Sequence, residues 1–305
     1  MASSLLRTAC LLACVAAPPL AAAHDHFVIH NDEILEPERP EAWAMRYMTA
    51  ATLMTSFGPV PALASGEWQV AGELGEIPHL DADQTAVGFN GIKGEDLNKS
   101  PITGRLRGWI GLPGGFVAEL GWTPPVEIDG AKPRDLFSAA IGRRFVDAHG
   151  YTVSARMFGQ HGAATGDITC PSDLVDVTDP DANPYGCVQR PSSDTLEMNY
   201  YGFDATFAYA TGPWTTHATG GLVRMENTVQ VDAITYGYPD RSYLVAHDDA
   251  WFLAAGVGRE LGSGWALAAE VLYVPLTVLR NPNGSADNDP LLSWRLQLRY
   301  RFTHE

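Results

Sequence analysis

The 305-residue sequence has no apolar run of 18 or more residues after its first 23 positions. A transmembrane helix needs about 20 apolar residues, so a helical membrane protein is excluded. The sequence also has no Gly-x-Ser-x-Gly elbow, no P-loop and no convincing dinucleotide fingerprint. No common nucleotide-binding or serine-hydrolase site is therefore predicted.

Basic residues are scarce, with 20 Lys and Arg against 36 Asp and Glu and a formal net charge of −16. This balance argues against a nucleic-acid partner, because the two polyanions would repel each other. Several arginines lie inside apolar stretches, whereas many carboxylates lie in the gaps between them: Asp81, Asp83, Glu95, Asp96, Asp173, Asp176, Asp179, Asp181, Asp287 and Asp289. This distribution is a first indication of a barrel with acidic loops.

Cysteine is rare as well, with only four in the chain. Cys10 and Cys14 lie within the first 23 residues, and Cys170 and Cys187 lie in one polar loop. A single pair in an exported protein predicts a disulfide, although two free thiols are the alternative. Closing a loop of that size stabilises by roughly 3 kcal/mol on the chain-entropy model.

Residues 1–23 read as a signal peptide. One arginine in residues 1–7 precedes an apolar stretch over 8–20, and Ala21 to Ala23 offer the small-x-small pattern of a cleavage site before His24. Residues 11–14 could also be read as a lipoprotein box. That reading leaves an apolar core of about six residues where about seven to fifteen are usual.

The last segment alternates with period two. Its apolar positions are Trp294, Leu296, Leu298, Tyr300 and Phe302, and its polar positions are Arg295, Gln297, Arg299 and Arg301. The segment resembles the C-terminal signal strand of Gram-negative outer-membrane proteins, which ends in an aromatic residue; here three residues follow Phe302. The resemblance implies a porin-like β-barrel in the bacterial outer membrane. Its implied partners are outer-membrane lipid, lipopolysaccharide and the barrel-assembly machinery.

Ten such segments are predicted: 67–77, 105–112, 116–122, 136–146, 151–167, 195–210, 216–232, 249–261, 265–280 and 294–302. The gaps between them alternate between long (79–104, 124–135, 168–194, 233–248, 281–292) and short (113–115, 147–150, 211–215, 262–264). Bacterial barrels have an even strand number, short periplasmic turns and long outer loops. We therefore expect an all-β, transmembrane antiparallel up-and-down β-barrel of about 10 strands over residues 67–305, with both termini in the periplasm.

A helix is expected before the barrel, within a periplasmic segment over residues 24–66. Pro40 and Glu41 suit a helix start, and Gly58 suits an end after residue 57. Trp43 and Tyr47 fall on one apolar stripe, so the helix must be buried, either as a lumen plug or as a cover of the periplasmic mouth. The alternative makes this stretch one or two more strands, which would give twelve.

The predicted lumen face collects charged residues: Glu73, Arg105, Arg107, Glu119, Arg156, Asp204, Glu270, Arg295, Arg299 and Arg301. Buried charges must pair or meet water, so they could form a salt-bridge lattice in a narrow, filled barrel. They could instead line a channel for small polar or anionic solutes. The expected function is thus non-enzymatic: a narrow channel or a structural protein of the outer membrane.

Metal sites have only weak candidates. His24 and His26 would open the processed chain, where a free amine and a histidine at the third position can hold Cu²⁺ or Ni²⁺; a soluble tail is the alternative. No cofactor is predicted. The acidic outer loops would need divalent cations beside lipopolysaccharide phosphates, because like charges repel.

An outer-rim hydrolase and a surface adhesin or receptor are the alternative functions. Some ten-stranded outer-membrane barrels are omptin-type proteases with acidic and histidine residues at the outer rim. His247, Asp248 and Asp249 lie near the predicted outer start of a strand, and histidine could activate a water there. No further omptin motif is present. An adhesin or receptor would instead use the acidic loops.

Overall fold

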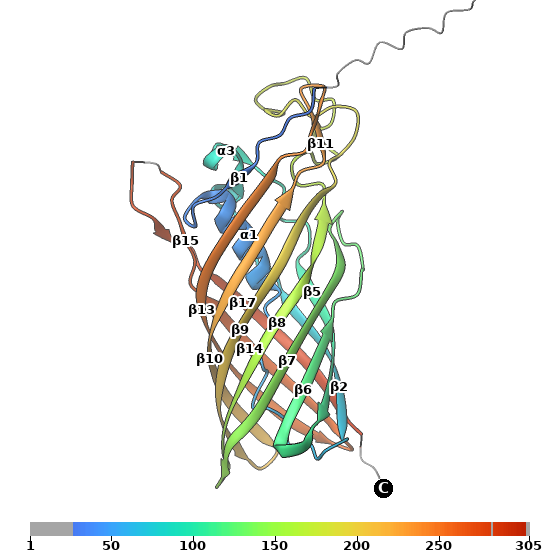
Figure 1. Ribbon diagram of the computed structural model, residues 1–305, viewed down its shortest axis with the longest axis vertical. Helices are drawn as coiled ribbons and strands as arrows, with labels where there is room; N and C mark the ends of the chain where they lie inside the picture. The colour runs from blue at the N-terminus through green and yellow to red at the C-terminus, as the bar shows by residue number, and fades with distance from the viewer. Residues whose placement is uncertain (1–26, 282, 303–305) are drawn as a thin grey trace, which may run out of the picture.

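Ten antiparallel strands form a closed barrel in the computed structural model, which describes residues 27–281 and 283–302 (Figure 1). The strands are β2 (Trp68–Glu76), β5 (Ile102–Gly111), β6 (Phe116–Trp122), β7 (Lys132–Ala148), β8 (Tyr151–Gly166), β9 (Asp194–Thr211), β10 (Trp214–Gln230), β13 (Tyr243–Gly262), β14 (Trp265–Val274) and β17 (Leu291–Arg301). Each strand pairs with the next in this order, and β17 pairs with β2 to close the ring. The prediction of ten strands is confirmed, and the alternative of twelve is wrong.

The two ends of the barrel differ. At one end, here called the inner end, turns of a few residues join the strands, such as η1 (Pro113–Gly115) and the turn at Ser263 and Gly264. The opposite, outer end carries the long loops. These loops contain α2 (Ala82–Thr85), β3 (Ala86–Val87), α3 (Gly88–Gly91), β4 (Lys93–Gly94), β11 (Ala233–Thr235), β12 (Tyr238–Asp240), β15 (Thr277–Val278) and β16 (Asp287–Asn288).

Two strand limits differ from the prediction by six residues, more than any other. β13 begins at Tyr243 rather than 249, because it stays paired with β10 up to Tyr243 while its outward side chains become polar and lose the apolar alternation. β14 ends at Val274 rather than 280. The wall formed by β7 to β10 and β13 therefore rises above the wall formed by β14, β17 and β2 (Figure 1).

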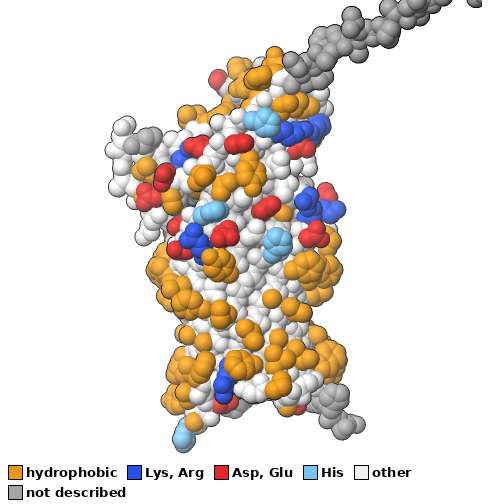
Figure 2. Space-filling model, viewed as in Figure 1, with side chains coloured by type: hydrophobic (Ala, Val, Ile, Leu, Met, Phe, Trp, Pro, Cys, Tyr) orange, Lys and Arg blue, Asp and Glu red, His pale blue; other side chains and the backbone are white. Residues whose placement is uncertain are grey.

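A belt of apolar side chains faces outward around the inner part of the barrel. Figure 2 shows these side chains over the lower half of one face, with most charged side chains above them. Exposed aliphatic residues from successive strands form the belt: Leu74, Leu106, Leu120, Ile141, Met157, Leu222, Leu253, Leu267 and Leu296. Aromatic residues border it, with Trp68, Tyr151, Tyr209, Trp214 and Trp265 towards the inner end and Trp122, Tyr201, Trp251 and Trp294 towards the outer end. Such girdles mark the two interfaces of a membrane.

The predicted helix is present as α1 (Pro40–Ala51) and lies inside the outer half of the barrel (Figure 1). Trp43 and Ala50 are completely buried, and Tyr47 is 3% exposed. The helix packs against an apolar lumen surface that includes Phe252 and Leu272. Among the described residues, no helix has both the length and the apolar character needed to cross a bilayer.

Residues 27–39 lie at the outer end, beside β13. β1 (Glu33–Ile34) pairs in parallel with Leu244 and Val245, and the backbone N–H of Leu279 donates to the carbonyl of Glu38 at 2.6 Å. The expected placement at the inner end is therefore wrong for residues 27–39, whereas the last described residue, Phe302, does lie at the inner end. The reason is that β14 pairs with β13 only from Leu253 to Gly262. The outer part of β13 is left with unpaired backbone groups, which residues 27–39 satisfy.

Residues 52–66 then descend through the lumen to the start of β2. The last described residue, Phe302, stacks on Trp68 at the inner end, with ring centroids 3.6 Å apart. The chain thus enters the lumen at the outer end and leaves it at the inner end before the first barrel strand. Residues 40–66, here called the plug segment, fill the interior.

Candidate functional site

The charged residues predicted to line the lumen all lie on inward positions of their strands. Eight of them are buried, with 1–6% of their surface exposed: Glu73, Arg105, Arg107, Glu119, Arg156, Asp204, Glu270 and Arg295. Arg299 is half-buried, and Arg301 is exposed at the inner end. The barrel therefore brings residues from seven strands onto one internal surface.

Six of these residues form a continuous chain of ion pairs around one wall, which begins with Arg105 Nη1 at 3.5 Å from Glu73. Arg107 Nη1 lies 2.8 Å from Glu73 and its guanidinium also binds Glu119. Arg156 binds Glu119 at 2.8 Å and Asp204 at 2.5 Å. Each carboxylate of this chain has a cationic partner, which offsets the cost of removing both charges from water.

The end of helix α1 is set by a distant side chain. Arg295 of β17 donates from Nη2 to the carbonyl oxygens of Ala50 and Ala51, at 3.3 and 3.0 Å, and from Nη1 to that of Leu53. A cation at a helix C-terminus also interacts favourably with the helix dipole. The predicted end at residue 57 is wrong, because these carbonyls accept from the barrel wall instead of from a further helical turn.

The carbonyl oxygens of the next residues are also bound by buried arginines. Arg105 Nη2 binds Thr52, Arg156 Nη2 binds Met54 at 3.0 Å, and Arg107 Nη2 binds Thr55 at 2.9 Å. An unsatisfied buried carbonyl costs about 1–3 kcal/mol, so these contacts hold the extended part of the plug segment in place. These three arginines thus bind carboxylates on one side and the plug backbone on the other.

Sequence reasoning missed several polar lumen residues, among them Tyr200 and Gln160. Tyr200 accepts from the backbone N–H of Met54 at 2.8 Å. Gln160 donates to Thr52 Oγ1 at 2.9 Å and accepts from Arg105 Nη2 at 2.9 Å. Both lie four residues from a predicted lumen residue of the same strand, Arg156 or Asp204, so the period-two rule could have found them.

A histidine and a carboxylate form a pair in the lumen, closer to the inner end of the barrel. His217 Nε2 lies 3.2 Å from Glu270 Oε2, and both side chains are almost completely buried. Nearby, Ser56 of the plug segment shares hydrogen bonds of 3.0 and 2.9 Å with Thr206 and Thr219. These polar contacts hold the plug segment in place closer to the inner end.

The plug segment is also held where it leaves the lumen. Val60 donates to Ser154 Oγ at 3.1 Å and accepts from Arg144 Nε at 2.5 Å. The cavity beside it, lined by Gly58, Arg156 and Arg299 among others, measures about 10 Å³. A single water needs about 10–15 Å³, so this cavity can hold about one water.

The three outer-rim residues suggested for catalysis do not share a face. Asp248 points inward and pairs with Arg46 of α1. His247 and Asp249 point outward, and Asp249 binds Arg224 at 3.1 Å. Alternation along β13 separates them, so the structure does not bring a histidine and the two carboxylates together.

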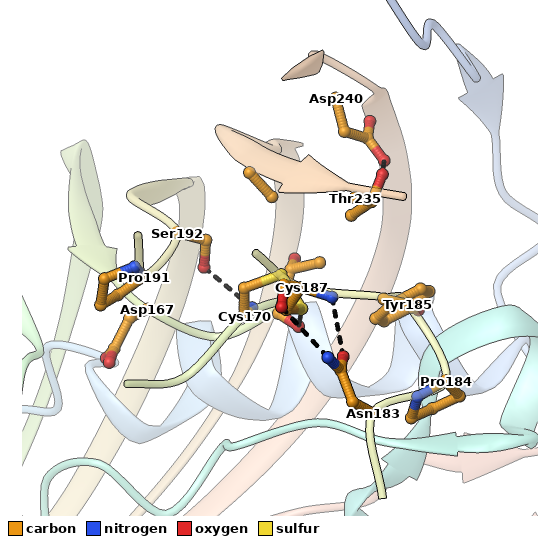
Figure 3. Close-up of a disulfide and its surroundings, with 12 residues drawn as sticks. Asp167, Cys170, Asn183, Pro184, Tyr185, Cys187, Pro191, Ser192, Thr235 and Asp240 are labelled. Atoms are coloured by element: carbon orange, nitrogen blue, oxygen red, sulfur yellow. Dashed lines mark hydrogen bonds between the residues drawn. A yellow bond between two sulfur atoms is a disulfide. The ribbon is translucent and has the colours of Figure 1, made fainter. Parts of the chain in front are cut away.

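The disulfide is confirmed. Cys170 and Cys187 are fully buried and joined, with their Cα atoms 5.6 Å apart (Figure 3). Asn183 accepts from the backbone N–H of Cys187 at 2.8 Å and donates to the carbonyl of Val177 at 2.9 Å. Ser192 Oγ accepts from Cys170 at 3.0 Å. The loop is therefore ordered by its own side chains.

The disulfide loop is fastened to the loop between β2 and β5. Lys93 Nζ binds Glu95 at 2.6 Å and the carbonyl of Thr169 at 2.9 Å, and it lies 4.0 Å from the ring centroid of Tyr185. Tyr185 donates to Glu95 at 2.8 Å. Burial raises the pKa of Glu95 to about 7 and lowers that of Lys93. Residues 78–101 and 168–193, here called the outer cap, are joined by this contact.

No metal centre emerges in the described part of the chain. His24 and His26 lie outside it. Within it, no group of three or more His, Cys, Asp or Glu residues is arranged to hold a metal ion. Carboxylates of the disulfide loop bind nearby backbone instead, as Asp176 does with the N–H of Gln189 at 3.1 Å.

No protein-family model matches the chain, and no curated protein matches it. Solved structures show distant similarity. The Ail attachment invasion locus protein of Yersinia pestis is 11% identical, with a TM-score of 0.31, over 78% of this chain and 99% of that one. The outer membrane protease OmpT of Escherichia coli is 11% identical, with a TM-score of 0.32, over 78% and 94%. The translocator domain of the autotransporter NalP from Neisseria meningitidis is 11% identical, with a TM-score of 0.36, over 87% and 99%.

Proposed function

We propose that this chain, a bacterial outer-membrane β-barrel, is a sealed structural barrel whose lumen is closed by its own plug segment. One observation carries the proposal: four buried arginines of the barrel wall bind the carbonyl oxygens of residues 50–55. Arginines that line a conducting pore must be free to exchange anions. Arg105, Arg107 and Arg156 are engaged with both carboxylates and backbone, and Arg295 with backbone, which favours the salt-bridge lattice over the selectivity lining.

The energetics support a fixed plug. Withdrawing the segment would leave buried arginines and backbone carbonyls without partners, at about 1–3 kcal/mol for each unsatisfied group. It would also expose the apolar lumen surface around Phe252 and Leu272 to water. Both the polar and the apolar contacts of residues 40–60 therefore oppose opening of the lumen.

The sealed barrel supports a rigid cap at the cell surface. Within the outer cap, a disulfide cross-links residues 168–193, and the contact of Lys93, Glu95 and Tyr185 joins them to residues 78–101. Its carboxylates would lie among the phosphates of lipopolysaccharide, where divalent cations reduce the repulsion. A hydrolase is less well supported, because His247 and Asp248 lie on opposite faces of β13.

Planar-bilayer recordings test the proposal. The unmodified chain should show no stable conductance steps, because residues 50–60 occupy the lumen. The double substitution Arg105→Ala with Arg295→Ala should produce transient openings, since it frees the carbonyls of Ala51 and Thr52. Arg224→Ala, on the outer surface, is the matched control and should remain closed. Stable steps from the unmodified chain would overturn the proposal.

A further inference from the structure

We propose that the inner mouth of the barrel is a binding site for a carboxylate-bearing polymer of the periplasm, namely peptidoglycan. The mouth contains a hollow of about 520 Å³ between residues 61–64 of the plug segment and three arginines, Arg143, Arg144 and Arg301. The short turns of a bacterial barrel face the periplasm, so the hollow opens towards the cell wall.

The floor of this hollow is rigid. The backbone N–H of Ala64 donates to Glu67 Oε2 at 2.9 Å, and the N–H of Gly66 donates to the carbonyl of Gly111 at 2.9 Å. Gly111 leaves room for this approach, because a Cβ there would collide with the carbonyl of Ala64. A ligand would therefore meet a preformed surface, which reduces the entropy cost of binding.

The charge of the inner end is opposite to that of the whole molecule. The chain has a formal net charge of −16. Among the described residues of the inner end, five arginines (Arg143, Arg144, Arg259, Arg299 and Arg301) face three carboxylates (Glu67, Asp147 and Glu260). A locally cationic mouth on an acidic protein favours an anionic partner at this end alone.

Several of these guanidinium groups have free donors. Arg143 stacks on Phe116, with its Cζ 5.4 Å from the ring centroid, and has no ion pair in the described structure. Arg299 has a buried Nε without a hydrogen-bond partner among the described residues. Arg144 and Arg301 each bind one carboxylate, of Asp147 and Glu67. A guanidinium has five N–H donors, so even these two can bind a second carboxylate.

The positions of the arginines favour a cell-wall polymer over a lipid headgroup. Arg144, Arg299 and Arg301 lie on inward positions, beside the plug segment. Arg143, at the rim of the hollow, and Arg259 lie on outward positions, where they stack on aromatic rings near the inner end. A phospholipid phosphate stays outside the aromatic girdle of the inner end and reaches only these two. Peptide carboxylates can enter from the periplasm and match the planar fork of arginine.

Cosedimentation with isolated peptidoglycan sacculi tests the inference. The detergent-solubilised full chain should sediment with the sacculi, and salt should weaken the interaction. Arg144→Ser with Arg301→Ser should weaken it by roughly tenfold, since each charge-assisted hydrogen bond contributes strongly. Glu67→Gln should strengthen it, because a competing carboxylate is removed from Arg301. Arg224→Ser, at the outer end, is the matched control and should bind as the unmodified chain does.

Two results would overturn the inference. One is equal sedimentation of the unmodified chain and the Arg144/Arg301 variant, with both shown to be folded by heat-dependent gel mobility. The other is binding to anionic phospholipid vesicles that depends on Arg143 and Arg259, together with no binding to sacculi. Neither result would affect the sealed-barrel proposal, because that proposal rests on the arginines that bind residues 50–55, whereas the hollow is lined by residues 61–64.

Discussion

His217 and Glu270 form a buried pair across a strand to which neither belongs. His217 lies in β10 and Glu270 in β14, and both are in register with Gly256 of the intervening β13. The side chains meet at 3.2 Å over this glycine. A Cβ at Gly256 would lie 2.7 Å from His217 Cε1, so the missing side chain is what permits the contact.

Gly256→Ala should therefore destabilise the barrel by about 1–3 kcal/mol, the usual range for overpacking a close-packed interior. Urea unfolding in lipid vesicles would measure the loss. Gly258→Ala is a matched control two residues along the same face, where the nearest atom to an added Cβ lies at 3.7 Å. If both substitutions cost the same, close approach at Gly256 is not what matters.

Arg156→Met should cost about 3–5 kcal/mol of unfolding free energy, because it leaves Asp204 and Glu119 buried without this partner. Asp204→Asn alone should also destabilise. The double variant should lose less unfolding free energy than the two single variants lose together, since the two residues share one contact. Urea unfolding of the three variants gives the coupling free energy. Additive losses of unfolding free energy would show that the two residues contribute independently.

A cysteine at Phe27 should react with a membrane-impermeant maleimide on intact cells, because this 65% exposed residue lies at the outer end. Ser65→Cys, exposed at the inner end, should react only after the outer membrane is permeabilised. The native Cys170–Cys187 disulfide leaves no competing thiol in the described chain. Labelling of Phe27→Cys only after permeabilisation would contradict the path of residues 27–66.

The contribution of Glu95 to stability should fall as pH rises. Burial raises the pKa of Glu95 from 4.5 to about 7, so between these values the folded state binds more protons than the unfolded state. Its stabilising contribution is present at acidic pH and is lost between about pH 4.5 and pH 7. The unfolding free energy of the unmodified chain minus that of Glu95→Gln, measured across this window, should decrease. A constant difference would mean that Glu95 titrates normally.

Local sequence pattern predicted much of the barrel. Alternation from Trp294 to Phe302 identified a strand with one lipid-facing side, and the same period placed Arg105, Arg107 and Arg156 on inward positions. Alternation is a property of any extended chain, so it needs no tertiary information. The helix start was predicted for a similar reason, because Pro40 and Glu41 act through the first helical turn alone.

Elsewhere, long-range contacts made predictions from local sequence pattern wrong. The helix ends at Ala51 because of Arg295, which is more than 240 residues away, and no local signal marks that position. His247, Asp248 and Asp249 are adjacent in the sequence, yet the pleat of β13 sends Asp248 to Arg46 and the other two outward. Neighbours in sequence were therefore mistaken for neighbours in a site.

The sequence by itself determined the strand number, the lipid-facing side and the presence of a buried helix, since each follows from periodicity and short-range caps. Only the tertiary structure decided that the plug segment enters from the outer end and that the lumen arginines bind it. Those outcomes depend on which strands extend further at the outer end and on which carbonyls come within hydrogen-bond distance of a guanidinium. Both are set when the ring of strands closes, and no stretch of the chain encodes them alone.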